Sequence, residues 1–253
     1  MEKETLQMHM LSTYNSLRFG MFAIAAAAPI AIVLWGFLFH VGWLNSISAY
    51  YFAPTADKWV YSAYPTRVLF VGILFALGSF LYLYRGFSTR ENVALNAAGA
   101  CALGVAVFPM YREVDYLPFS NILHFSFAIL LFICMAYTAI FCHEDTLRFV
   151  ADANRRKHYK VVYHLIGLFM GLFPLVGLVM AALFGAMQRH VFWIEAAGIW
   201  AFAAYWFTKS QELKESQAEV KAATGTLTQP PPGPSSNQSP ASFDPKGEPI
   251  PGV

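Results

Sequence analysis

Six long apolar segments constrain this chain more than any other feature of its sequence. They cover residues 21–44, 67–85, 92–110, 120–141, 161–184 and 191–209. A hydrocarbon core about 30 Å thick is crossed by roughly 20 residues of helix, so each segment is long enough to span a membrane. The sequence therefore predicts an all-α, polytopic membrane helix bundle with six transmembrane helices.

Composition and charge agree with this fold class. Hydrophobic residues make up 57% of the chain and charged residues only 13%, with a mean hydropathy of +0.46. A soluble domain typically carries about 25% charged residues. The formal net charge of +2 is small, so the sequence indicates the lipid bilayer, and not nucleic acid, as the partner of this protein.

The chain divides into three predicted parts. Residues 1–20 form an amphipathic N-terminal lead-in, residues 21–210 the six-helix transmembrane domain, and residues 211–253 a cytoplasmic extension and tail. Within the last part, residues 211–222 are expected to be helical. From residue 223 onward Pro, Ser, Gly, Gln and Asn dominate, and such a composition cannot bury enough apolar surface to fold. We therefore expect a disordered Pro-rich tail.

The placement of Lys and Arg predicts the orientation of the bundle. Thirteen of the seventeen Lys and Arg residues lie on the side of the two termini and of the connections after the second and fourth segments. Cytoplasmic loops are enriched in these residues. Both termini are therefore expected in the cytoplasm, and residues 45–66, 111–119 and 185–190 are expected to face outward.

Small residues predict where the helices approach one another closely. The fifth segment contains Gly167-x-x-x-Gly171, the second contains Gly72-x-x-x-Ala76 and the adjacent Gly78, and the third, 92–110, is rich in Ala and Gly. Such residues let helix backbones come together in lipid. The third segment is thus predicted to be central and closely packed. These motifs serve either packing within one chain or a homo-oligomer, and the sequence leaves both open.

Polar residues of interest gather at the outward ends of the segments. Glu195 lies about one turn inside the sixth segment, His124 lies at a similar depth in the fourth, and Arg67 opens the second. Because an unpaired carboxylate is costly in a membrane, Glu195 should face the bundle and find a partner. The simplest expectation is an Arg67–Glu195 pair with His124 nearby, acting either as an interhelical lock or as a ligand site. Ser46 and Ser48 lie in the adjoining aromatic-rich outward loop.

The preferred functional hypothesis is a non-enzymatic protein that binds a lipid or a membrane partner through this outward face. Its ligand-binding residues would be Ser46, Ser48, Arg67, His124 and Glu195. The planar guanidinium of Arg67 suits a lipid phosphate or carboxylate. This hypothesis assigns no catalytic residue, no metal ligand and no cofactor.

Two alternatives stay open. A metal-dependent membrane hydrolase would use His40, His124 and Glu195 near the metal, although the chain contains no His-Glu-x-x-His motif. A small transporter is the third hypothesis. Such proteins usually carry paired broken helices, whereas we expect a break in the fifth segment alone, at its interior Pro174.

Several short motifs carry a resemblance to a known group of proteins. They are Ser46-Ile47-Ser48-Ala49-Tyr50-Tyr51, Arg67-x-x-Phe70-Val71-Gly72, Tyr84-Arg85-Gly86 and Ala106-Val107-Phe108-Pro109. The pattern resembles uncharacterised bacterial six-span membrane proteins grouped as a domain of unknown function, and it is loosely similar to the DRAM-like family. The resemblance covers roughly residues 35–209. It implies a bacterial inner-membrane protein and carries over no catalytic residue. Eukaryotic relatives are associated with membrane trafficking and lipid regulation, which is an analogy of fold only.

Overall fold

The computed structural model describes residues 2–55, 63–111, 119–184 and 190–225. In these residues all regular structure is helical, which confirms the predicted all-α bundle. The helices are α1 (Glu2–Leu38), η1 (Ser48–Phe52), α2 (Pro65–Leu83), α3 (Thr89–Val107), α4 (Phe119–Phe141), α5 (Glu144–Leu147), α6 (Ala153–Phe184), α7 (His190–Ser216) and α8 (Ala218–Ala223).

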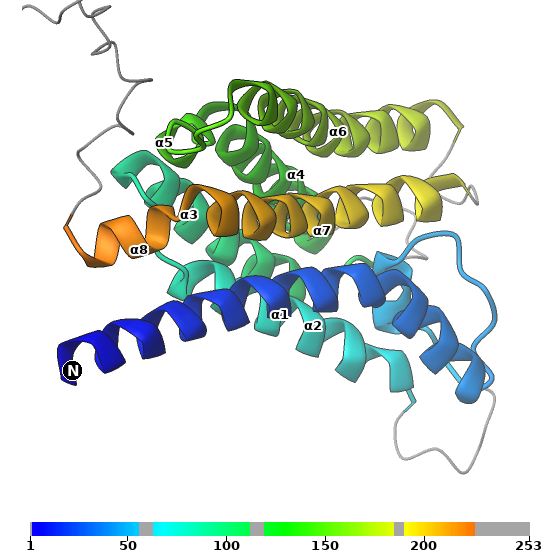
Figure 1. Cartoon of the computed structure of the whole chain (residues 1–253). Coiled ribbons are helices and arrows are strands. Elements are labelled where there is room, and N and C mark those ends of the chain that lie inside the picture. The colour runs from blue at the N-terminus through cyan, green and yellow to red at the C-terminus, as the bar shows by residue number, and fades with distance from the viewer. Residues whose placement is uncertain (1, 56–62, 112–118, 185–189, 226–253) are drawn as a thin grey trace, which may run out of the picture.

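The six long helices form a closed ring (Figure 1). Going round the ring, α1 packs against α2, α2 against α3, α3 against α4, α4 against α6 and α6 against α7. The ring closes because α7 packs back against α1. Neighbours in space are thus neighbours in sequence, apart from this one closing contact.

Five of these helices are long and apolar enough to cross a membrane: α1, α2, α4, α6 and α7. Their exposed surface carries many large apolar side chains, such as Val68, Phe141 and Leu168, as expected for helices that face lipid. The protein is therefore membrane-embedded. The sixth long helix, α3, lies between α2 and α4 but is poorer in large apolar residues, so its role as a sixth span stays a prediction.

The predicted close packing of α3 is visible at two facing glycines. A Cβ atom on Gly99 would lie 2.7 Å from the carbonyl oxygen of Gly78 in α2, closer than real Cβ atoms come. By contrast, a Cβ atom on Gly72 would have nothing within 4 Å. The helix contact thus uses Gly78 and Gly99, and the predicted Gly72-x-x-x-Ala76 motif contributes nothing to it at Gly72.

Two reciprocal hydrogen bonds between backbone amides and side chains fix the start of α3. The backbone amide of Glu91 donates to the Ser88 hydroxyl at 3.2 Å, and the Glu91 Oε2 atom accepts from the backbone amide of Phe87 at 2.7 Å. This is close to a capping box, in which two otherwise unpaired amides at a helix start are satisfied by side chains. The turn after α2 therefore brings the Glu91 carboxylate into the interior.

The two ends of the described chain meet at one end of the ring, here called the terminal end (Figure 1). Arg18 of α1 pairs with Glu219 of α8, and the Gln7 side chain donates to the carbonyl of Ala223 at 2.9 Å. Helix α1 runs unbroken through residue 20, so the predicted lead-in is continuous with the first span. The predicted disordered tail lies, from residue 226 onward, outside the described residues.

Candidate functional site

Residues 45–55 fold over the other end of the ring and are here called the lid. The lid contains η1 and is anchored at its centre by Tyr50, whose buried ring packs so closely that a Cβ atom on Gly36 of α1 would lie 3.0 Å from it. The Thr66 hydroxyl of α2 donates to the Tyr50 carbonyl, and Thr55 Oγ1 donates to the Phe39 carbonyl at 2.6 Å. The lid is thus held to α1 and α2 on one side of the ring.

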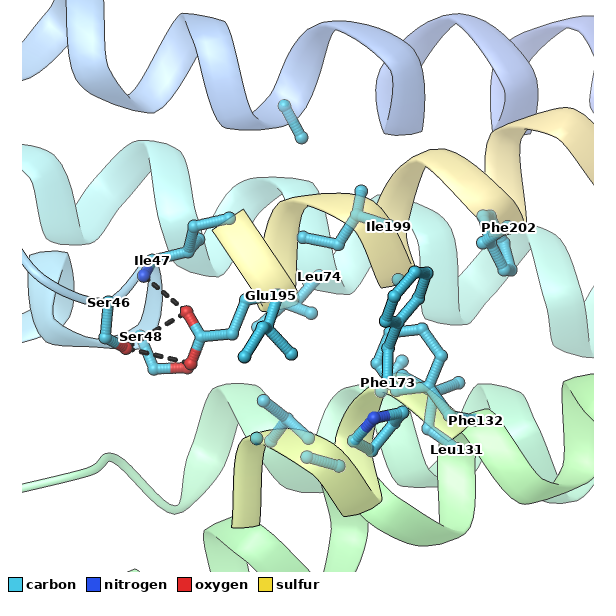
Figure 2. A pocket seen from close by; sticks show the side chains of 18 of the residues that line it. Ser46, Ile47, Ser48, Leu74, Leu131, Phe132, Phe173, Glu195, Ile199 and Phe202 are labelled. Atoms are coloured by element: carbon cyan, nitrogen blue, oxygen red, sulfur yellow. Dashed lines mark hydrogen bonds between the residues drawn. The ribbon is translucent and has the colours of Figure 1, made fainter. Parts of the chain in front are cut away.

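Glu195 of α7, the helix that packs against α1, also holds the lid (Figure 2). Its two carboxylate oxygens accept from the Ser46 hydroxyl at 2.9 and 3.0 Å, and Oε2 also accepts from the backbone amide of Ile47. Hydrogen bonds to an ionised acceptor are stronger than neutral ones. The partner that the sequence required for Glu195 is therefore the lid.

His124 of α4 holds the lid at a second point. Its Nδ1 atom lies 2.8 Å from the Phe108 carbonyl oxygen, and its Nε2 atom lies 3.1 Å from Ser48 Oγ. Because a carbonyl only accepts, Nδ1 carries the proton, and Nε2 of the neutral ring accepts from the Ser48 hydroxyl. The two lid serines therefore each donate to a different helix of the bundle.

Arg67 lies elsewhere, and the expected Arg67–Glu195 pair is wrong. Its Nε atom donates to the Tyr51 carbonyl at 3.2 Å, and its guanidinium carbon lies 4.4–4.8 Å from the centres of three rings, those of Tyr51, Phe52 and Tyr64. Cations are attracted to aromatic faces at such distances. The aromatic loop residues next to Arg67 satisfy it locally, so the side chain is not drawn across to α7.

Beneath the lid lies a cavity of about 360 Å³ inside the ring. All six long helices and the lid contribute to its wall, which is almost entirely apolar (Figure 2). In the described part of its wall the polar side chains are those of Ser46, Ser48 and Glu195, and of these Glu195 alone is ionisable. The cavity is therefore amphipathic, with its polar groups gathered beneath the lid.

Of the five residues that the sequence singled out, the structure brings four together. Ser46 and Glu195 form one hydrogen-bonded pair, and Ser48 and His124 form the other. His124 faces the lid without lining the cavity, and Arg67 belongs to the aromatic cluster outside it.

A second polar cluster, which the sequence analysis missed, lies at the terminal end. Lys209 and Glu212 of α7 are both fully buried and form an ion pair of 3.1 Å. The Thr146 hydroxyl of α5 and the Tyr163 hydroxyl of α6 also donate to Glu212 Oε2, at 3.0 and 3.1 Å. The one signal in the sequence was the spacing of Lys209 and Glu212, three residues apart on a helix. Such spacing is compatible with an ion pair but does not show that the pair is buried.

The metal-site alternative finds no support in this geometry. Among the described residues there is no group of three or more His, Cys, Asp or Glu side chains placed to hold a metal ion. Both ring nitrogens of His124 have protein partners.

Comparison with known proteins adds no assignment, because no family model, curated protein or solved structure matches the chain.

Proposed function

We propose that this membrane protein holds one single-chain amphiphile inside its ring of helices, with the polar end of the ligand beneath the lid. The observation that carries this proposal is the cavity itself. It is apolar along its length, polar at one end, and surrounded by helices that face lipid on their outer side. A concave, mainly apolar site with a few convergent polar groups is the usual form of a ligand site.

The volume limits the size of the ligand. A cavity of about 360 Å³ favours a ligand with one short hydrocarbon chain over a two-chain phospholipid. Typical ligand pockets range over about 300–1,000 Å³, so this cavity belongs to the small members of that class.

The charge of the wall limits the head group. Among the described residues that line the cavity, Glu195 is the one ionisable residue, and none is Lys, Arg or His. A phosphate or carboxylate head would face this carboxylate without a counter-charge, whereas a hydroxyl or amino head would donate to it. The expected ligand is therefore neutral or cationic. Arg67 as a phosphate holder has no place in this proposal, because it lies outside the cavity wall.

The proposed setting is a bacterial inner membrane, with the terminal end in the cytoplasm and the lid end outside. The basic residues between α4 and α6 and in the first turns of α6, including Arg148, Arg155 and Lys160, support this orientation. In this setting the lid closes the cavity toward the outside. Binding, and not catalysis, is proposed because the polar side chains that line the cavity already have hydrogen-bond partners in the protein, Ser46 with Glu195 and Ser48 with His124.

The test is retention of a ligand during purification. The protein is purified in mild detergent and examined by native mass spectrometry, and we expect one bound amphiphile of small mass per chain. Replacement of Ser46 by alanine, which removes the hydroxyl bond to Glu195, should lower occupancy. Ser120 is the control, because it does not line the cavity and its hydroxyl donates to the Pro109 carbonyl at 2.7 Å. Replacement of Ser120 by alanine should leave the occupancy unchanged. A wild-type protein that carries no amphiphile under these conditions would refute the proposal.

A further inference from the structure

The cluster at the terminal end contains one buried ammonium group and two buried carboxylates. Lys209 is 1% exposed, and Glu212 and Glu91 are 0% exposed. Their charges act on one another, since Glu91 is influenced by both Lys209 and Glu212. If all three groups are ionised, the cluster holds an uncompensated negative charge, which is costly away from water.

The two carboxylates are not equally well supported. Glu212 accepts from three donors, the Lys209 ammonium at 3.1 Å and the hydroxyls of Thr146 and Tyr163. Glu91 accepts from a single backbone amide, that of Phe87, and only through Oε2. Its Oε1 atom is buried and has no hydrogen-bond partner among the residues that the structure describes. The ammonium charge therefore stabilises Glu212, and Glu91 has no hydrogen-bonded cation of its own.

The other charged side chains around Glu91 do not neutralise its carboxylate, because they are already paired with one another. Arg18 binds Glu219, and Arg90 lies 3.7 Å from Asp145. The ionisable groups that act on Glu91 or are influenced by it come from most of the surrounding elements: Lys209, Glu212 and Tyr205 of α7, Tyr163 of α6, Asp145 of α5, Cys142 before α5, and Tyr84 after α2.

We propose that Glu91 is a proton-binding site and carries a proton in the folded protein at neutral pH. A proton from water adds to the unpartnered Oε1 oxygen, and the carboxylate becomes a neutral carboxylic acid. The cluster then holds one positive and one negative charge. The added O–H is a donor, and Glu212 Oε1 is a buried acceptor of the same cluster without a hydrogen-bond partner in the described part of the chain. The bond from the Phe87 amide to Oε2 persists, so the cap of α3 does not depend on the charge.

This proton couples the packing of the terminal end to pH. In the unfolded chain Glu91 would lose its proton near the ordinary glutamate pKa of about 4.3. Above that pH the folded state binds one more proton than the unfolded state, so stability falls as pH rises. The fall ends once Glu91 ionises in the folded protein as well.

The test compares Glu91→Gln with the wild type in lipid nanodiscs. Infrared spectra at neutral pH should show the C=O band of a protonated carboxylic acid in the wild type, and Glu91→Gln should lack that component. Glu195→Gln controls for the carboxyl group beneath the lid, and Glu215→Gln for a carboxylate paired with Arg155 at 2.7 Å on the surface. Both controls should retain the Glu91 component.

Thermal melting gives a second readout, because glutamine mimics the protonated acid. The melting temperature of Glu91→Gln should equal or exceed that of the wild type at neutral pH, and should fall less as pH is raised. A Glu91→Gln protein that melts earlier at neutral pH, or fails to fold, would mean that the negative charge is required. Either result, or a wild-type spectrum without the acid band, overturns the proposal.

Discussion

Filling the cavity from one wall provides the sharpest test of its nature. Ala102 of α3 lines the cavity, and replacement by leucine adds three carbon groups. At roughly 30 Å³ per group these add about 90 Å³ of side chain to the wall of a cavity of about 360 Å³. If the space is open to a ligand, the leucine enters it at little cost to the protein and displaces the amphiphile. We expect the Ala102→Leu variant to melt at a temperature close to that of the wild type without ligand. Native mass spectrometry should show a clear loss of bound amphiphile.

The matched control lies one turn away on the same helix. Ala98 is also fully buried, but it belongs to the packed core and does not line the cavity. Leucine at this position should cost about 1–3 kcal/mol, as is usual when a filled core is overpacked. The reasoning is refuted if Ala102→Leu destabilises the protein as much as Ala98→Leu and leaves the bound amphiphile in place. That result would show that the space is not a ligand cavity.

Two further predictions concern the helix ring and its buried ion pair. Gly99→Ala should weaken the contact between α2 and α3 by about 1–3 kcal/mol, whereas Gly72→Ala should be neutral or stabilising by up to about 1 kcal/mol. Unfolding in mixed micelles measures both changes in stability. Equal effects of the two substitutions would contradict the assigned contact. Lys209→Met should cost about 3–5 kcal/mol because it leaves Glu212 buried without its cation. Adding Glu212→Gln should recover most of that loss, and a double variant as unstable as the single one would contradict the pairing.

The sequence predicted the architecture because lipid imposes a simple rule. A helix that faces lipid must be apolar over roughly 20 residues, so the segments at 67–85 and 120–141 appear in the structure as α2 and α4 with nearly the same bounds. The same rule flagged Glu195 and His124, since ionisable groups inside apolar segments need partners. The composition of α3, rich in small residues, also predicted its close contact with a neighbour.

The partners of those groups could not be predicted, because they depend on how a loop folds back. Nothing in the sequence showed that the lid would place Ser46 within hydrogen-bond distance of Glu195, or that Tyr51 and its neighbours would hold Arg67. The buried cluster at the terminal end was missed for a related reason. Lys209 and Glu212 stand just beyond an apolar run, where charged residues usually meet water, and only the packing of α5 and α6 around them removes that water.

The closed ring has a consequence for how the chain can be cut and rejoined. Because Gln7 contacts Ala223, a short peptide linker placed after α8 could reach the start of α1 without crossing the bundle. New ends could then be opened in the connection between α6 and α7, and every helix would keep both of its neighbours. Circular order, and not the position of the first residue, is what this architecture requires.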